Sequence, residues 1–553
     1  MKRSILRLIT AAVSVAAHWA GTSAFANGAD FTPLSKPQYK LYSVCSNKID
    51  ASKEDLRLIA ENFEFYHGKF QPEQADAIRE INPAFKCLTY INSTYTQSEA
   101  DVRLVESQYR DCLSMLVAAR LSQSIEAGST KFRVEPAGDG QKSGGKEVPI
   151  PIRASTIAGD YSSIENGKPS TKFYVFWIRI GDELMRVNQF IPATGDIEVA
   201  RSFAGTASAA HPAKANVFSP VYLGFDRSPK SKESANTSSR GNYPNGHDDK
   251  LRYVLDPAYR KGYLFQGETV LKAMQENRVD GVWMDTLNTG TFNLSDCLGR
   301  AAAGKVWDFA KNQPYAPDDF RLGQEKKVAF IGQFINERLG KFPFLVANNL
   351  TDAYAPGRGG LKLLLMATEV KPRPLDAYCM EGGLELQSPE KWKKRIVMLM
   401  DAAQSGLAAA PIWANAGSPS YAESEPDTPG RDKAERFGYA SYLLGVEKEG
   451  KTLMGTYAFY QANGKRFVKI HPMYYYPIGY PAVTVKPNEF GKYLMKDVPV
   501  YHRSFTNGLV LVNSSDQDCP VKLEETYFDP DTRQLVTTVT MSAGTGKILL
   551  NKP

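Results

Sequence analysis

Eight short apolar runs, separated by amphipathic segments of helical period, extend along most of this 553-residue chain. Such alternation predicts repeated strand-helix units whose strands pair in parallel. Eight units are the number that closes a (β/α)8 TIM barrel. The alternative is an open doubly wound sheet, which usually needs fewer units and a phosphate-binding loop that this sequence lacks. We therefore expect an α/β fold built on a TIM barrel. The expected strands are 39–44, 63–67, 86–92, 281–285, 344–349, 376–381, 408–415 and 456–461.

Two β-rich stretches depart from this alternation. In the first, β-rich runs are separated by Gly181-Asp182 and by Thr194-Gly195-Asp196, which are turn sequences typical of hairpins. In the second, near the C-terminus, short β runs are separated by Asn-Gly, Asp-Pro and Gly-Thr turns, which favours a β-sandwich. The expected division is a signal peptide (1–26), the first part of the barrel (38–123), an inserted small β module (124–225), a flexible linker (226–250), the second part of the barrel (251–487) and a C-terminal β-sandwich (488–553).

The first 26 residues have the pattern of a secretory signal. A basic start is followed by an apolar stretch from Leu8 to Ala20 and by the small-x-small sequence Ala24-Phe25-Ala26. An uncleaved membrane anchor is the alternative, but the apolar stretch is shorter than the roughly 20 residues that a span needs. We expect cleavage and a secreted or periplasmic protein without stable membrane insertion.

Charge and motif content exclude several classes of function. Loss of the signal leaves 64 basic against 60 acidic residues, a net charge of +4, which argues against nucleic acid as a partner. The six cysteines form no C-x-x-C pair, and the sequence has no H-E-x-x-H, G-x-S-x-G or P-loop motif. We therefore expect neither a metal nor an organic cofactor, and we expect a monomer.

Two carboxylates end strands of the expected barrel. Barrel enzymes carry their working groups at the C-terminal ends of the strands, where Asp285 follows GVWM and Glu381 follows DAYCM. Alternation places Asp285 on the face of Trp283. A pair of carboxylates is what glycosidic cleavage requires, with Asp285 as nucleophile or base and Glu381 as acid. The alternative is that each acid only caps a helix or forms a turn.

Other polar and aromatic residues at the expected strand ends are candidates for binding a sugar, although asparagines at such positions are often turn residues. These candidates are Asn92, Asn348, Asn349, Trp413, Asn415 and Tyr460. The tyrosines at 474–476 and 480 either form a sugar-stacking wall or bury the seam between barrel and sandwich.

The order of INPAFKCLTYIN, RYVLDPAYRKGYL, NRVDGVWMDTLN, LVANNL and YCMEGG resembles a group of bacterial hypothetical glycoside hydrolases. This is a (β/α)8 family-15-like group, more distantly related to endo-galactosaminidases, and the final sandwich is similar to the domain that commonly follows glycosidase barrels. The resemblance covers 38–95 and 250–485. It implies that Asp256 lies beside the site, with Asp285 on the fourth strand and Glu381 on the sixth, as in retaining α-galactosidase-like barrels. The β module and linker stand where that family usually has a short loop.

These observations favour a secreted or periplasmic glycoside hydrolase that acts on a poly- or oligosaccharide by a two-carboxylate mechanism. The alternative is a non-catalytic carbohydrate-binding or surface-assembly protein on a degenerate barrel, with the β module as its adhesive part. The turn-separated runs of that module weakly resemble short β modules of phage tail proteins, which motivates the alternative.

Overall fold

The computed structural model describes most of the chain. The described residues are 31–48, 51–93, 112–137, 141–143, 146–148, 162–165, 168–171, 177–191, 193–220, 222–223, 252–253, 255–256, 260–285, 306–348, 375–380, 384–386, 388–406, 408–411, 429–456, 459–462 and 465–552. None of the helices in this part of the chain is both long and apolar enough to cross a membrane.

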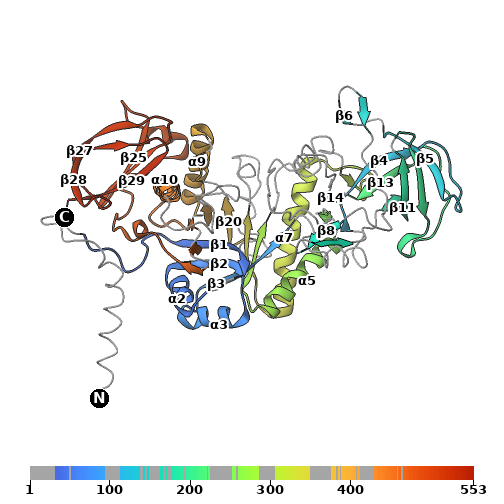
Figure 1. The fold of residues 1–553 in the computed structure, drawn as a ribbon, viewed down its shortest axis with the longest axis horizontal. Coiled ribbons are helices and arrows are strands. Elements are labelled where there is room, and N and C mark those ends of the chain that lie inside the picture. The colour runs from blue at the N-terminus through green and yellow to red at the C-terminus, as the bar shows by residue number, and fades with distance from the viewer. Residues whose placement is uncertain are drawn as a thin grey trace, which may run out of the picture.

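The centre of the molecule is a sheet of eight strands, all paired in parallel (Figure 1). The order is β21-β20-β19-β16-β3-β2-β1-β22, and the two end strands also approach each other, so that the sheet is a nearly closed barrel. The strands are β1 (Leu41–Lys48), β2 (Phe63–Lys69), β3 (Lys86–Asn92), β16 (Gly281–Asp285), β19 (Phe344–Asn348), β20 (Ala377–Met380), β21 (Ala409–Pro411) and β22 (Met454–Thr456).

Seven of these strands overlap the expected ones, although β1 extends further and β21 is shorter than expected, whereas the eighth is wrong in position. The barrel strand ends at Thr456, where the expected strand begins. The following strand β23 (Phe459–Ala462) instead forms an antiparallel hairpin with β24 (Lys465–Val468). The reason is visible in the sequence, because Asn463-Gly464 separates the two strands and is a strong hairpin turn signal.

Helices pack against the outer face of the sheet (Figure 1). The helices are α2 (Lys53–Asn62), α3 (Pro72–Ile81), α5 (Arg260–Glu276), α7 (Pro317–Leu339), α9 (Pro389–Gln404) and α10 (Pro429–Gly445). Their ends follow local sequence: Ser52 and Asp55 form a capping box on α2, and Ser388 caps α9. Helix α7 begins at a proline and ends before Gly340, whose φ of 68° is the left-handed conformation that glycine tolerates.

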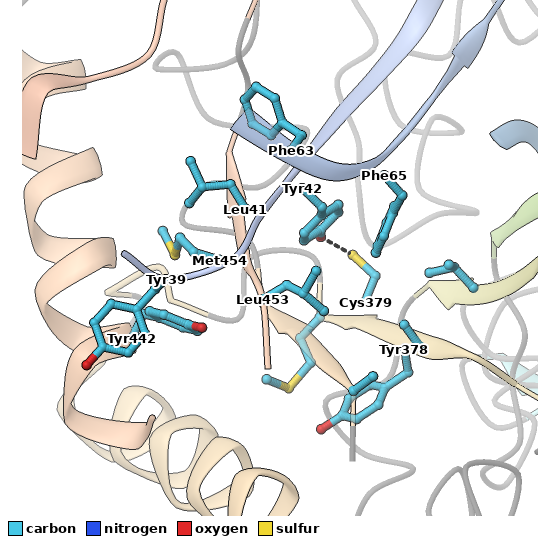
Figure 2. Packing of buried hydrophobic residues seen from close by; sticks show 14 of the residues in the cluster. Tyr39, Leu41, Tyr42, Phe63, Phe65, Tyr378, Cys379, Tyr442, Leu453 and Met454 are labelled. Carbon is cyan, nitrogen blue, oxygen red and sulfur yellow. Dashed lines mark hydrogen bonds between the residues drawn. The ribbon is translucent and has the colours of Figure 1, made fainter. Parts of the chain in front are cut away.

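The barrel interior is filled by large side chains from several strands. Figure 2 shows the Tyr42 hydroxyl directed at the Cys379 sulfur, 2.7 Å away, although β1 and β20 are not neighbours in the sheet. The Tyr42 ring also stacks on Phe65 of β2, with ring centroids 4.8 Å apart. Large side chains from β1 and β2 thus fill this part of the interior, and barrel enzymes carry their sites at the C-terminal strand ends.

The inserted β module is a second barrel, closed and six-stranded, in the order β10-β11-β12-β5-β4-β13. Its two expected hairpins are confirmed, because β10 pairs with β11 across Gly181 and β11 pairs with β12 across Gly195. The first strand of this barrel precedes residue 124, where the module was expected to begin. The strands are β4 (Met115–Leu121), β5 (Lys131–Glu135), β10 (Trp177–Ile180), β11 (Glu183–Ile191), β12 (Asp196–Ala200) and β13 (Asn216–Pro220).

Apolar residues fix this second barrel to the first. Trp177 and Phe218 of the module share one buried cluster with Leu255 and with Phe265 of α5. The chain enters and leaves the module at one place, because Leu113 and Leu255 form an antiparallel bridge.

Several short elements complete this part of the chain. They are the strand pairs β6 (Gln141–Ser143) with β7 (Lys146–Val148), β8 (Ser162–Glu165) with β9 (Lys168–Thr171), β14 (Tyr222–Leu223) with β15 (Arg252–Tyr253) and β17 (Trp307–Asp308) with β18 (Gln313–Pro314), and the 3-10 helices η2 (Phe203–Gly205), η4 (Pro472–Tyr475) and η5 (Pro487–Tyr493).

The C-terminal strands form one antiparallel sheet of five strands, at the opposite end of the molecule from the module (Figure 1). Its order is β25-β26-β29-β27-β28, and the two-layered sandwich stays a prediction. Arg503 of β25 anchors the sheet by donating to the carbonyls of Leu443, Leu444 and Val446 at the end of α10. The strands are β25 (Val500–Phe505), β26 (Gly508–Asn513), β27 (Cys519–Asp529), β28 (Gln534–Met541) and β29 (Thr545–Asn551).

The tyrosines after the eighth strand belong mostly to the seam between the barrel and this sheet. Tyr474 is buried and donates to Glu435 of α10. Tyr476 is also buried and donates to Asp531 in the turn that follows β27. Tyr474 and Tyr476 therefore bury the seam between the barrel and the C-terminal sheet and do not form a sugar-stacking wall.

Candidate functional site

Asp285 is the last residue of β16, and side chains from two neighbouring strands hold its carboxylate. The Tyr90 hydroxyl of β3 donates to Oδ2 at 2.6 Å, and the Asn348 amide of β19 donates to Oδ1 at 2.9 Å. The Asp285 side chain is half-buried, whereas Asn348 is buried. Because each oxygen has its own donor from a different strand, the direction of the carboxylate is fixed at the barrel mouth.

The main chain of Asp285 is held as well. Its carbonyl accepts hydrogen bonds from the Ser93 amide at 2.9 Å and from the Ser93 hydroxyl at 2.8 Å. Asn92, the residue before Ser93, is buried and pairs in register with Asp285. The Asn92 carbonyl in turn accepts from Gln266 of α5 at 3.2 Å.

An aromatic stack lies below the carboxylate. The Trp283 ring lies parallel to the His67 ring, with centroids 4.2 Å apart and 15° between the planes, and is tilted against Tyr90 at 5.6 Å. Burial lowers the pKa of His67 to about 3. The imidazole is therefore neutral near pH 7 and serves as a packing element rather than as a proton donor. Trp283 and Asp285 share the inner face, as strand alternation requires.

Asp256 lies behind this arrangement, at the junction with the β module. Its carboxylate accepts a hydrogen bond from the Tyr315 hydroxyl at 2.8 Å, and its amide donates to the Cys112 carbonyl at 2.6 Å. Burial, the Asp256 charge and the hydrogen bond to Asp256 raise the pKa of Tyr315 far above its ordinary value. Asp256 is 2% exposed, so its side chain lies inside the protein and does not line an open mouth.

Lys327 of α7 is a buried basic residue of this region. Its side chain is 1% exposed, and its ammonium group donates to the Ser93 carbonyl. Burial lowers the pKa of Lys327 to about 7, against an opposing effect of the Asp256 charge. Lys327 therefore contacts the segment that holds the Asp285 main chain, and the charge of Asp256 acts on it.

The structure brings together three of the residues singled out in the sequence, Asp285, Asn348 and Asn92. Asp256 is linked to them through its charge, which acts on Lys327. Glu381, Asn349, Trp413 and Asn415 lie outside the described residues, and so does the side chain of Tyr460. The Tyr460 backbone belongs to the hairpin β23–β24 and not to the eight-stranded sheet, which removes the reason for placing it at the mouth.

Sequence reasoning missed Tyr90, Ser93 and Lys327. Tyr90 was within reach, because it precedes Asn92 by two residues and therefore shares its face of β3. Lys327 could not be predicted, because the sequence KKVAFIGQF does not indicate that the second lysine of the pair is buried and the first exposed. Among the residues that the structure describes, no three His, Cys, Asp or Glu side chains gather in a way that could hold a metal ion.

Comparisons with known proteins add little. No family model matches the chain, and no curated protein does. Among solved structures, the chain is similar to a cycloisomaltooligosaccharide glucanotransferase of Paenibacillus sp. in complex with cycloisomaltoheptaose, with 9% identity and a TM-score of 0.33. The match covers 93% of this chain and 55% of the glucanotransferase, so this chain spans about half the length of that enzyme. A likeness of this size carries no argument about activity, and the resemblance to bacterial glycoside hydrolases stays a prediction.

Proposed function

We propose that this protein is a glycoside hydrolase that cleaves a poly- or oligosaccharide with Asp285 as nucleophile or base. The observation that carries the proposal is the Asp285 carboxylate at the C-terminal end of a barrel strand, with each oxygen held by a donor from a neighbouring strand. A carboxylate that attacks an anomeric carbon, or takes a proton from water, must keep one direction through the reaction.

The proposed acid is Glu381. In this scheme its proton goes to the glycosidic oxygen as the bond from that oxygen to the anomeric carbon breaks, and water supplies the hydroxyl of the new reducing end. Asp285 either forms the intermediate bond to the anomeric carbon or activates the water. The reaction needs no group beyond two carboxylates and water. Asn348, which is 1% exposed and donates to Asp285, is proposed to orient that carboxylate, and Asp256 is proposed to support it from behind. Sugar binding by Asn348 and Asn92 stays a prediction.

The test is a screen of polysaccharides with the full chain, with products detected by mass spectrometry of new reducing ends. Asp285→Asn and Glu381→Gln should each lower the rate about 10²- to 10⁴-fold, the range that a positioned acid or base contributes. Asp182→Asn is the matched control, because this carboxylate lies fully exposed on the β module. If both site variants keep the wild-type rate, the assignment is wrong.

The same screen tests the competing function. Binding of a glycan without release of any product would favour a carbohydrate-binding or surface-assembly protein. Secretion or periplasmic location is proposed from the N-terminal pattern alone, and processing at Ala26 is checked by the mass of the protein after export.

A further inference from the structure

Lys327 is a buried basic residue that the proposed chemistry does not use. It lies on α7, on the outer side of the strands that carry Asn92 and Asp285, and only 1% of it is exposed. A lysine is almost never fully buried without a partner, because removal of the ammonium group from water is costly. Its burial therefore needs an explanation in terms of what the ammonium group contacts.

Lys327 contacts the main chain of the site. The ammonium group donates to the Ser93 carbonyl, and Ser93 donates from both its amide and its hydroxyl to the Asp285 carbonyl. The chain of contacts from Lys327 to Asp285 thus passes through a single residue. A shift of Ser93 changes the position from which the Asp285 side chain leaves the strand.

The charge that acts on Lys327 is that of the Asp256 carboxylate. Asp256 opposes the effect of burial on the Lys327 pKa and is itself held by Tyr315, just before α7. Tyr263 of α5 also faces Asp256, and burial together with the Asp256 charge raises the pKa of Tyr263 to about 12. Asp256 is therefore the carboxylate that favours the ammonium form of Lys327 in this cluster.

We propose that Lys327 is a positioning residue for Asp285, acting through Ser93, with Asp256 as its counter-charge. The inference rests on the proposed function, since positioning has a catalytic meaning only if Asp285 reacts. It goes further by assigning a role in the reaction to a helix residue that touches neither substrate nor the reacting carboxylate.

The test compares Lys327→Met, Lys327→Arg and the control Lys326→Met in the full chain. Lys326 precedes Lys327 on α7 and is exposed, so its substitution removes the same charge without touching Ser93. Lys327→Met should lower kcat about 100-fold, the effect of a misplacement near 1 Å, and change KM less than about twofold. Lys327→Arg keeps a cationic donor and should recover at least a tenth of the wild-type kcat.

A second readout does not depend on activity. The Ser93 amide donates to Asp285, and its hydrogen exchange should be at least tenfold faster in Lys327→Met than in Lys326→Met. If Lys327→Met does not fold, Lys327→Arg decides the matter: its kcat must be at least a tenth of the wild-type value, and its exchange at Ser93 must be less than tenfold faster than in Lys326→Met.

Failure of the inference and failure of the proposed function are distinguishable. A wild-type protein that cleaves no glycan, with faster exchange at Ser93 in Lys327→Met, contradicts the hydrolase and keeps the structural link. A wild-type protein that cleaves, with kcat and exchange unchanged in Lys327→Met, overturns the role of Lys327. A rise in KM alone also overturns it, because it would mean that Lys327 serves binding and not the position of Asp285.

Discussion

Glu183 of the β module offers a quantitative test of a buried polar network. Its carboxylate accepts hydrogen bonds from Arg201 Nε at 2.7 Å and Nη2 at 2.6 Å, and lies 2.9 Å from Nε2 of His211. The Glu183 side chain is 0% exposed and that of Arg201 7%. We predict that Glu183→Gln strongly destabilises the module, because it leaves the Arg201 charge buried without its partner.

Two independent routes give the size of the effect. Loss of one partner of a buried ion pair costs about 3 to 5 kcal/mol. Burial by itself would raise the pKa of Glu183, but the hydrogen bonds from Arg201 and His211 prevail and lower it to about 2. Relative to an ordinary value of about 4.3, a shift of roughly 2 units corresponds to about 3 kcal/mol.

The sign of the pH dependence follows from the lowered pKa. The stabilisation is fully present above pH 4.3, where the carboxylate is charged in the folded and unfolded chain alike. It is lost as the pH falls through the folded value of about 2, because the unfolded chain binds the proton first. The Glu183→Gln protein should lack this acid-dependent loss.

The assay is native-state hydrogen exchange of peptides from β11 and β12 at pH 7, with increasing urea. Glu198→Gln is the matched control, since Glu198 forms an exposed ion pair with Lys131 on the same barrel and should contribute at most about 1 kcal/mol. An opening free energy for Glu183→Gln within 1 kcal/mol of the control would refute the reasoning.

Two further substitutions test the way the parts are packed. Gly281→Ala would place its Cβ 1.9 Å from the Phe344 carbonyl oxygen, so β16 and β19 must separate. We expect a loss of about 2 kcal/mol or more and a lower Tm, and an unchanged Tm would contradict this strand spacing. Arg503→Met leaves the carbonyls at the end of α10, including that of Leu444, without their donor. We expect a loss of about 3 kcal/mol in urea unfolding, and a loss below 1 kcal/mol would show that Arg503 does not anchor the sheet.

Much of the fold was predictable because burial on both faces of a parallel strand leaves a continuous apolar run. The run GVWMD gave its strand boundaries directly, and its final Asp285 marked the mouth. The strand Met115–Leu121 is not predicted from its sequence, because MLVAARL has the composition of a helix and becomes a strand through its antiparallel pairing, most extensively with β13. Local sequence cannot report a partner that lies about a hundred residues away.

The candidate site was predictable to a similar degree. Asp285 and Asn348 could be predicted because each is the last residue of a strand, and the C-terminal ends of parallel strands lie at the same edge of the sheet. Lys327 was not found, because burial of a helical lysine depends on the tertiary position of Ser93 and Asp256 rather than on the sequence around it.

The position of the β module between two neighbouring strands of the large barrel has a consequence for assembly. Strands β3 and β16 must pair although residues 93 to 280 lie between them. A folded module brings its own ends together, as the bridge between Leu113 and Leu255 shows. The loop to be closed then shortens from roughly 190 to roughly 50 residues, which lowers the entropic cost of closure by about 1 kcal/mol. Prior folding of the module thus favours the pairing of β3 with β16, which places Asn92 beside Asp285.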